Sequence, residues 1–426
     1  MDQFLDVSRF WYMFFSFFVV VLSLMFLRLF LRCWILPVRA QKKLRENGFS
    51  GPPPIFVYWL GIEPFVYVAD PEFLSVMSKG VLGKSWGKPN VFKKDREPMF
   101  GTGLVMAMTS MMVESISNML DRWDIQINSG NPEFDMENEI IGTAGEIIAK
   151  TSFGVTGENG TQVLKNLRAV QFALFDSNRY VGVPFSNILA LKQTLKAREL
   201  GKEIDGLLLS IINERKRSLA GGDDHHDLLQ MLLKADKGKF TATELVDECK
   251  TFFFAGHETT ALALTWTFML LAVHPEWQDT LRSEIRQVIG DSEIDYNKLA
   301  GLKKMTWVMN EVLRLYPPAP NAQRQARKDI KVNGRVIPND DVNEFRPERF
   351  DGSLHGGCKN KMGFMPFGFG GRMCIGRNLT TMEYKIVLSL VLSRFEISVS
   401  PGYQHSPKYM LSLRPGYGLP LIIRPL

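Results

Sequence analysis

The stretch Pro366-Phe367-Gly368-Phe369-Gly370-Gly371-Arg372-Met373-Cys374-Ile375-Gly376 decides how the rest of the chain is interpreted. Its three glycines within four positions predict backbone that turns tightly or lets another group approach closely. Residues 378–395 then have the apolar content of a helix, so Cys374 is expected just before a helix N-terminus. Backbone N–H groups and the helix dipole stabilise a thiolate at such a place. A thiolate is usually a nucleophile or a metal ligand; the alternative is a small buried cysteine in a turn.

This string resembles the haem-binding loop of the cytochrome P450 monooxygenases, in which Phe367, Gly370, Arg372, Cys374 and Gly376 stand at the family's spacing. The resemblance implies that Cys374 is the axial thiolate of the iron of haem b, whose electron donation favours O–O cleavage. It also implies that Arg372 pairs with a haem propionate and that Phe367 packs beside the Fe–S bond. Gly376 completes the cofactor-binding motif.

The remaining cysteines offer little competing chemistry. Cys33, Cys249 and Cys358 form no close pairs with one another or with Cys374, which argues against a disulfide framework and fits a reducing compartment. A zinc site from His355, Cys358 and Cys374 is the alternative metal hypothesis. It lacks the Cys-x-x-Cys pair that structural zinc sites use, so the haem hypothesis is favoured.

A second motif, Ala255-Gly256-His257-Glu258-Thr259-Thr260, lies within residues 244–273, which predict a long buried helix. A glycine, an acid and two hydroxyls are poor choices for a buried helix unless something uses them. Small Ala255 and Gly256 would let a flat ligand lie close, and the Thr259 hydroxyl can bond back to a carbonyl and open the helix locally. A kinked core helix with a satisfied hydroxyl is the alternative.

The same motif resembles the oxygen-activation motif of the cytochrome P450 family. By this resemblance, Glu258 and Thr259 are the catalytic acid and alcohol that relay protons to iron-bound dioxygen, and His257 is a spacer.

Two further segments fit the family in the expected order. Glu311 and Arg314 stand three apart, hence on one face of the helix predicted over residues 303–316. In the family such a pair binds the arginine of a later Pro-Glu-Arg-Phe segment, here Arg349, and supports the haem loop. Arg324 matches the family's second propionate-binding arginine.

The N-terminal part predicts a membrane anchor. Residues 10–27 are apolar except for two serines, which is about the length that spans a bilayer. Six basic residues follow between residues 28 and 45 with no acid among them, so the positive-inside rule keeps the body cytosolic. We therefore expect a single-pass signal anchor in the endoplasmic reticulum membrane over residues 1–27, a basic flank and proline-rich hinge over 28–54, and a haem-thiolate domain over 55–426.

Those six charges equal the formal net charge of +6. The rest of the chain is therefore balanced, and the basic pI gives no support to nucleic-acid binding.

The body predicts a mostly α fold with small β-sheets, that is, an incomplete cytochrome P450 fold. A β-hairpin is expected over residues 55–69 and strands over 395–426. Helices are expected over 107–127, 136–153, 162–175 and 195–219, and a polar connection over 291–301.

Three joins depart from the family pattern. Pro54 runs straight into a strand, and Asp340-Asp341 leads directly to the Pro-Glu-Arg-Phe segment, where strands and a tryptophan-bearing turn are expected. Between Met106 and Ala107 the family places a helix with a Trp-x-x-x-Arg pair, which contacts a haem propionate and presents basic residues to the reductase. The chain thus resembles a form that lacks internal segments.

By resemblance, the function is monooxygenation of an apolar small molecule with electrons from an NADPH-dependent cytochrome P450 reductase. Residues 83–86 and 247–260 are similar to a plant microsomal clan that contains cytokinin hydroxylases and gibberellin oxidases and also acts on terpenoids and fatty acids. Two alternatives stay open: a reductase-independent hydroperoxide rearrangement, and a non-catalytic, haem-deficient remnant.

Overall fold

The computed structural model describes residues 15–21, 23–24, 27, 55–60, 63–68, 74–75, 86–87, 109–154, 158–177, 191–222, 227–236, 240–294, 296–320, 325–326, 345–353, 355–356, 361–368 and 373–426. Two compact units can be separated in the chain. The first comprises Met1–Asp70 and Asp176–Leu195, and the second comprises Pro71–Phe175 and Lys196–Leu426.

The first unit contains the predicted hairpin. Strands β1 (Ile55–Leu60) and β2 (Glu63–Val68) pair antiparallel, with Ile55 opposite Val68. Of the predicted membrane span over residues 10–27, residues 15–21, 23, 24 and 27 are described; they are helical and their side chains are exposed. Within the described parts of the chain, no helix has the length and apolar character needed to cross a bilayer.

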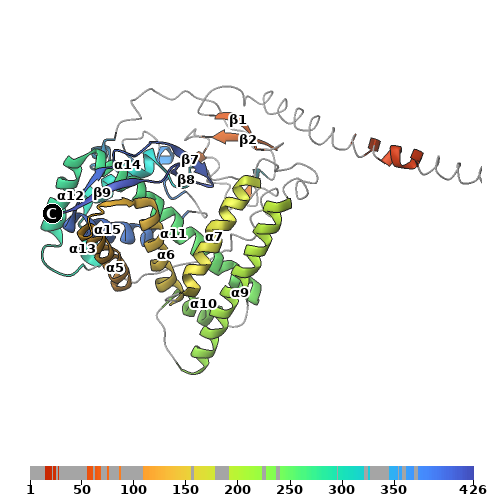
Figure 1. The fold of residues 1–426 in the computed structure, drawn as a ribbon, viewed down its shortest axis with the longest axis horizontal. Helices are drawn as coiled ribbons and strands as arrows, with labels where there is room; N and C mark the ends of the chain where they lie inside the picture. Colours follow the sequence, from red (N-terminus) through yellow and green to blue (C-terminus); the bar gives the residue numbers. More distant parts are fainter. Residues whose placement is uncertain are drawn as a thin grey trace, which may run out of the picture. The chain divides into compact units, whose positions relative to one another are not determined.

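The second unit is mostly helical (Figure 1). Its helices are α5 (Thr109–Asn128), α6 (Met136–Phe153), α7 (Glu158–Ser177), α9 (Leu191–Ala220), α10 (Leu228–Asp236), α11 (Ala242–Val273), α12 (Pro275–Val288), α13 (Tyr296–Leu299), α14 (Lys303–Leu315) and α15 (Arg377–Arg394), although the last residues of α7 and the first residues of α9 fall in the first unit. The helices predicted from periodicity are present within a few residues. The predicted polar connection over 291–301 holds the short helix α13, and α10 and α12 lie where the sequence pattern predicts no element.

Helix α11 is the central element of this unit. Its first turn is closed by a capping box, in which Thr241 and Glu244 satisfy each other's backbone N–H groups. The helix runs for 32 residues, most of them buried, and packs along α6. Phe153 and Phe253 stack between the two helices with ring centroids 4.2 Å apart. This packing buries one long side of α11 and fixes the direction in which its other side chains point.

Small sheets complete the unit, as the C-terminal sequence predicted. A three-stranded antiparallel sheet has the order β4 (Glu133–Asp135), β9 (Pro420–Pro425), β6 (Phe395–Val399). Strands β7 (Pro407–Met410) and β8 (Ser412–Pro415) form a hairpin, and β3 (Trp86–Gly87) pairs with β5 (Gln325–Ala326). Strand β4 was not predicted, because three residues are too few to give a periodic signal.

Helix α6 ends at Gly154, whose φ of +58° is left-handed. The Gly154 N–H donates to the Lys150 carbonyl at 3.0 Å. A Cβ at this position would lie 2.5 Å from Nη2 of Arg215 and 2.6 Å from Oδ2 of Asp227. These two side chains form a buried ion pair, and Arg215 also donates to the Phe153 carbonyl. Glycine is therefore required here by both backbone conformation and space.

We predict that Gly154→Ala lowers the free energy of unfolding by about 3 kcal/mol, because it adds left-handed strain and displaces a buried ion pair. Gly130→Ala is the matched control, since Gly130 has a φ of +88° but a Cβ there would meet no atom within 4 Å. Gly130→Ala should lower the free energy of unfolding by only about 1 kcal/mol. Urea unfolding measures both, and equal losses would contradict the role of the ion pair.

Candidate functional site

The loop that carries Cys374 is closed by its own backbone. The Cys374 N–H donates to the Phe367 carbonyl at 2.7 Å, and Gly368 adopts a φ of +72° between them. The Cys374 residue is exposed, and the backbone N–H groups of Gly376 and Arg377 point at its sulfur. Helix α15 starts directly after, with Gly376 at its N-cap. The predicted glycine turn, exposed cysteine and helix start are thus present.

The surroundings of Cys374 act on its pKa in two directions. Desolvation raises the pKa of the thiol, whereas the backbone N–H groups of Gly376 and Arg377 lower it, as expected at the start of a helix. The N–H groups at the start of α15 thus favour the thiolate, and the role of Cys374 as an iron ligand stays a prediction.

Helix α15 connects the cysteine loop to α11. The Thr380 hydroxyl, in the first turn of α15, lies 3.1 Å from the Thr260 hydroxyl of α11. One turn further on, the buried Tyr384 hydroxyl lies 2.7 Å from that of Thr267. These side-chain contacts hold the start of α15 beside the sequence motif of α11.

The motif on α11 exposes Ala255 and leaves Thr259 half-buried. The Thr259 hydroxyl donates to the Ala255 carbonyl at 2.8 Å, which confirms the predicted back-bond. The helix nevertheless stays continuous through this point, so the predicted local opening is absent. Gly256 also differs from expectation, because a Cβ there would lie 2.5 Å from Cδ1 of Ile148 on α6. Its small size serves helix packing; Ala255 is the small residue on the exposed side.

Glu258 is buried in a polar network that sequence reasoning missed. Its Oε1 accepts hydrogen bonds from Gln171 Nε2 at 3.0 Å, Ser412 Oγ at 2.7 Å and Arg414 Nη2 at 2.9 Å. Arg414 lies on β8, and its Nε is also 3.4 Å from Oε1 of Glu137 on α6. No local pattern marks Arg414, because its partners are far away in sequence.

The charges in this network set the ionisation of both acids. Burial alone would raise the pKa of Glu258, but the Arg414 guanidinium and its other donors outweigh burial and hold that pKa below its ordinary value. For Glu137 burial prevails over Arg414 and raises the pKa to about 6. His257, which precedes Glu258 on α11, has its pKa lowered by burial. Glu258 is thus an ionised, fixed carboxylate beside a neutral imidazole.

The predicted contact between Glu311, Arg314 and Arg349 is present. Arg314 binds the fully buried Glu311 carboxylate with both Nε and Nη2, at 2.7 and 2.8 Å. Arg349 lies on the short 3-10 helix η3 (Pro347–Phe350), and its Nε is 3.4 Å from Oε1 of Glu311. The backbone N–H of Arg346 donates to the same oxygen. The network ties α14 to η3; its role in supporting a haem loop stays a prediction.

Arg324 and Arg372, predicted for the haem propionates, lie outside the described residues. The described residues fit a haem iron in their donor chemistry: an exposed sulfur with N–H groups aimed at it, and a hydroxyl and a small residue on the exposed side of α11. Phe367 is half-buried beside the loop, with the Arg377 guanidinium 5.9 Å from its ring centroid. Among the described residues, no cluster of three or more His, Cys, Asp or Glu side chains offers another metal site.

Residues 87–342 and 340–420 match the family model described as Cytochrome P450. The two matches meet at residues 340–342, where the join at Asp340-Asp341 was predicted. Among solved structures, the crystal structure of a cytochrome P450 (CYP102L1) has a TM-score of 0.71 at 23% identity, and the match covers 90% of this chain and 97% of that one. This likeness shows the fold.

Curated plant relatives match over most of the chain. A cytokinin hydroxylase from Arabidopsis thaliana is 33% identical, over 87% of this chain and 81% of the relative. Cytochrome P450 714C3 from Oryza sativa is 30% identical, over 96% of this chain and 98% of the relative. The latter alignment runs over 505 positions, whereas this chain has 426 residues, so at least 79 positions have no counterpart here. This agrees with the predicted loss of internal segments.

We predict that Glu311→Gln lowers the free energy of unfolding by about 3 kcal/mol, because it removes a fully buried carboxylate that two half-buried arginines bind. Glu199→Gln is the matched control: Glu199 pairs with Lys196 at the same spacing of three, but both side chains are more than half exposed. Glu199→Gln should lower the free energy of unfolding by no more than about 0.5 kcal/mol. Chemical unfolding distinguishes them, and a small loss for Glu311→Gln would contradict the proposed strength of the buried network.

Glu383 on α15 generates a pH-dependent prediction. Burial raises its pKa to about 8, and its Oε1 has no hydrogen-bond partner among the residues that the structure describes. Because the folded chain keeps a proton that the unfolded chain releases, stability should fall as pH rises from about 4.5 to about 8. Glutamine has no such proton to lose, so at pH 7 Glu383→Gln should raise the free energy of unfolding by about 3 kcal/mol relative to the wild type.

The measurement is the unfolding free energy of the wild type and of Glu383→Gln at pH 5 and pH 7.5. Glu396→Gln, at an exposed position on β6, controls for the loss of one carboxylate elsewhere. A stability difference between wild type and Glu383→Gln that does not change with pH would rule out the raised pKa as its cause.

Proposed function

Because this chain belongs to the cytochrome P450 family, we propose that it works as a haem-thiolate monooxygenase with Cys374 as the iron ligand. The observation that carries this proposal is the placement of an exposed cysteine directly before α15, whose first turn contacts α11 next to Thr259. This arrangement puts a sulfur donor on one element and an alcohol on a neighbouring one.

When bound, haem supplies the iron that activates dioxygen. Cys374 would hold it through the sulfur, and Arg324 and Arg372 would bind its propionates. The Thr259 hydroxyl donates its own proton to the Ala255 carbonyl, so its oxygen is free to accept one from another donor. The Glu258 carboxylate has three donors on Oε1, which leaves Oε2 as the oxygen to carry a proton. Glu258 and Thr259 would thus handle protons from fixed positions.

The relatives and the sequence both support one substrate class. Similarity to a cytokinin hydroxylase and to a rice cytochrome P450 supports an apolar plant small molecule of the hormone, terpenoid or fatty acid class. Electrons would come from an NADPH-dependent cytochrome P450 reductase.

A membrane anchor is part of this proposal. The apolar residues 10–27 and the basic residues that follow support a single-pass anchor in the endoplasmic reticulum membrane, with residues 55–426 as a cytosolic haem domain. The helical residues in this stretch carry exposed apolar side chains such as Phe15 and Phe17, which water does not favour.

A second candidate function is a non-catalytic, haem-deficient remnant. Its support is the loss of at least 79 aligned positions and the interruption of the family match at residues 340–342. The missing Trp-x-x-x-Arg segment between Met106 and Ala107 would leave a haem propionate without one of its contacts.

The deciding measurement is the CO-difference spectrum of the reduced, full-length chain in membranes. We expect a Soret band at the thiolate-ligated position, lost in Cys374→Ser because an alcohol is a poor iron ligand. Cys249→Ala is the matched control, since Cys249 is fully buried and burial raises its pKa to about 12. If the wild-type chain takes up no haem, the monooxygenase proposal is wrong and the chain is a haem-deficient remnant.

For a chain that does bind haem, turnover separates the enzyme hypotheses. Monooxygenation should require NADPH and reductase, whereas hydroperoxide rearrangement should not. Thr259→Ala should lower the amount of product formed per NADPH by about tenfold or more, because it removes the hydroxyl oxygen that accepts a proton in the proposed relay. An unchanged ratio of product to NADPH in Thr259→Ala would contradict the role of this hydroxyl in proton transfer.

A further inference from the structure

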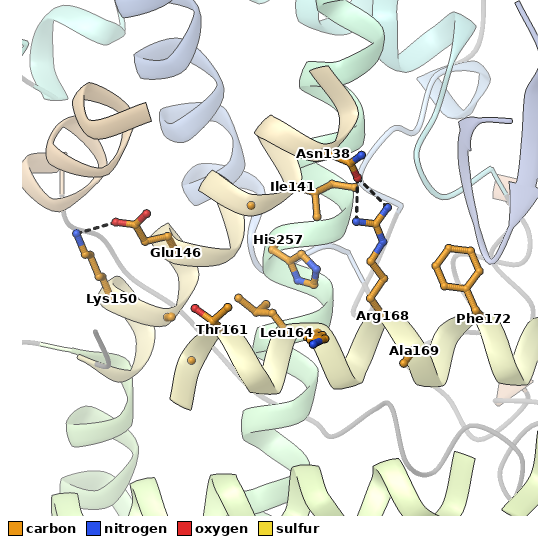
Figure 2. Close-up of a pocket in the computed structure, with 14 residues that line it drawn as sticks. Asn138, Ile141, Glu146, Lys150, Thr161, Leu164, Arg168, Ala169, Phe172 and His257 are labelled. Carbon is orange, nitrogen blue, oxygen red and sulfur yellow. Dashed lines mark hydrogen bonds and ion pairs between the residues drawn. The ribbon is translucent and has the colours of Figure 1, made fainter. Parts of the chain in front are cut away.

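A cavity of about 770 Å³ lies between α6, α7 and α11, and nothing in the proposed reaction uses it. Figure 2 shows His257 of α11 between side chains of α6 and α7, with Ile141, Leu164 and Arg168 around it and the Glu146–Lys150 pair turned away to one side. Small-molecule sites in proteins have volumes of about 300 to 1,000 Å³. The cavity is therefore large enough for a ligand of drug-like size.

This cavity opens on a different side of α11 from the proposed haem site. His257, which lines it, precedes Thr259 by two residues, which corresponds to about 200° around a helix. Thr259 bonds back to Ala255 on the exposed side, whereas His257 is buried against α6 and α7. A ligand here would not occupy the space next to Thr259.

The cavity carries excess positive charge. The Arg168 guanidinium donates from Nη1 and Nη2 to Oδ1 of Asn138 at 3.2 and 3.3 Å, and in the described part of the chain it has no carboxylate within ion-pair distance. Lys165 is exposed on the same helix and has no ion pair among those residues either. Lys150, by contrast, is neutralised by Glu146 at 2.9 Å. Within that part of the chain, Arg168 and Lys165 are thus two cationic groups without an ion-pair partner.

The rest of the lining is largely apolar. Ile141 and Ala149 from α6 and Leu164 from α7 form part of it, and Phe172 lies with its ring centroid 6.0 Å from the Arg168 guanidinium. Two polar groups remain, the Thr161 hydroxyl and the His257 imidazole. The Nδ1 atom of His257 is 2.5 Å from the Phe253 carbonyl, which fixes the proton on Nδ1 and makes Nε2 an acceptor. An apolar body with one negative charge matches this lining.

We propose that this cavity binds an apolar monocarboxylate, with the carboxylate on Arg168 and the apolar body between α6, α7 and His257. Arg168 is suited to this because a guanidinium binds a carboxylate with two parallel hydrogen bonds. Its present partner, a single amide oxygen, is a weaker acceptor than a carboxylate. A cationic ligand would be repelled by both Arg168 and Lys165.

Gly142 offers a way to close the cavity without disturbing the fold. It lines the cavity on α6, and a Cβ there would meet no atom within 4 Å. Among the described residues the space beside Gly142 is open, so Gly142→Leu should fill part of the cavity. Gly206→Leu on α9 is the matched control, because Gly206 is also helical, has equally open surroundings among those residues and does not line the cavity.

The test uses isothermal titration calorimetry of the full-length chain in nanodiscs with 4-phenylbutanoate, and with 4-phenylbutan-1-ol as its uncharged counterpart. We expect the carboxylate to bind about tenfold more tightly than the alcohol. Gly142→Leu should abolish carboxylate binding, and Gly206→Leu should leave it unchanged. Arg168→Gln should weaken it by about tenfold, down to the affinity of the alcohol.

Lys165→Glu, at an exposed position that tolerates substitution, should weaken carboxylate binding by about threefold or more through repulsion. Circular dichroism verifies that each variant is folded; Lys165→Glu keeps the test valid if Arg168→Gln does not fold. Equal affinity for the acid and the alcohol, or binding that survives both Gly142→Leu and Lys165→Glu, would overturn the proposal. The readout is binding alone, so it does not depend on haem or on turnover.

Discussion

The close approach of α6 and α11 is the constraint on which the second unit depends. At Gly256 the side chain of Ile148 on α6 packs so near the α11 backbone that even a methyl group would meet it. Such contact fixes α11 in rotation as well as in position, because a turn of the helix would bring a larger side chain against α6. Consequently Thr259, Glu258 and His257 each have a defined direction: toward the exposed side, into the Arg414 network, and toward α7.

Buried charges in this protein are tolerated only where partners converge on them. Glu311 has no exposed surface and is bound by two arginines and a backbone N–H. Glu258 is satisfied by an arginine, a glutamine and a serine from two other elements. In both cases a carboxylate connects segments that are distant in sequence. Removing one member of such a buried pair costs far more stability than the intact pair contributes. These two networks therefore specify which elements meet.

Local sequence patterns predicted much of this structure, and the reason is physical. Helix α6 has the bounds that periodicity predicted, and the back-bond of Thr259 needs only a carbonyl four residues earlier. The Glu311 network was predictable only through its resemblance to a family. Arg414 was missed, because it lies 156 residues from Glu258 and nothing in its own strand marks it. The small size of Gly256 was assigned to a ligand, since a sequence does not say which neighbour approaches a glycine.

Strand β9 has a consequence for how the chain acquires its structure during synthesis. It is formed by Pro420–Pro425, yet it is the middle strand of its sheet, between β4 near residue 134 and β6. On a ribosome, β4 therefore emerges long before the strand that must satisfy its backbone. The sheet cannot form until Pro420–Pro425 has been synthesised, and until then β4, between α5 and α6, lacks the strand that pairs with it.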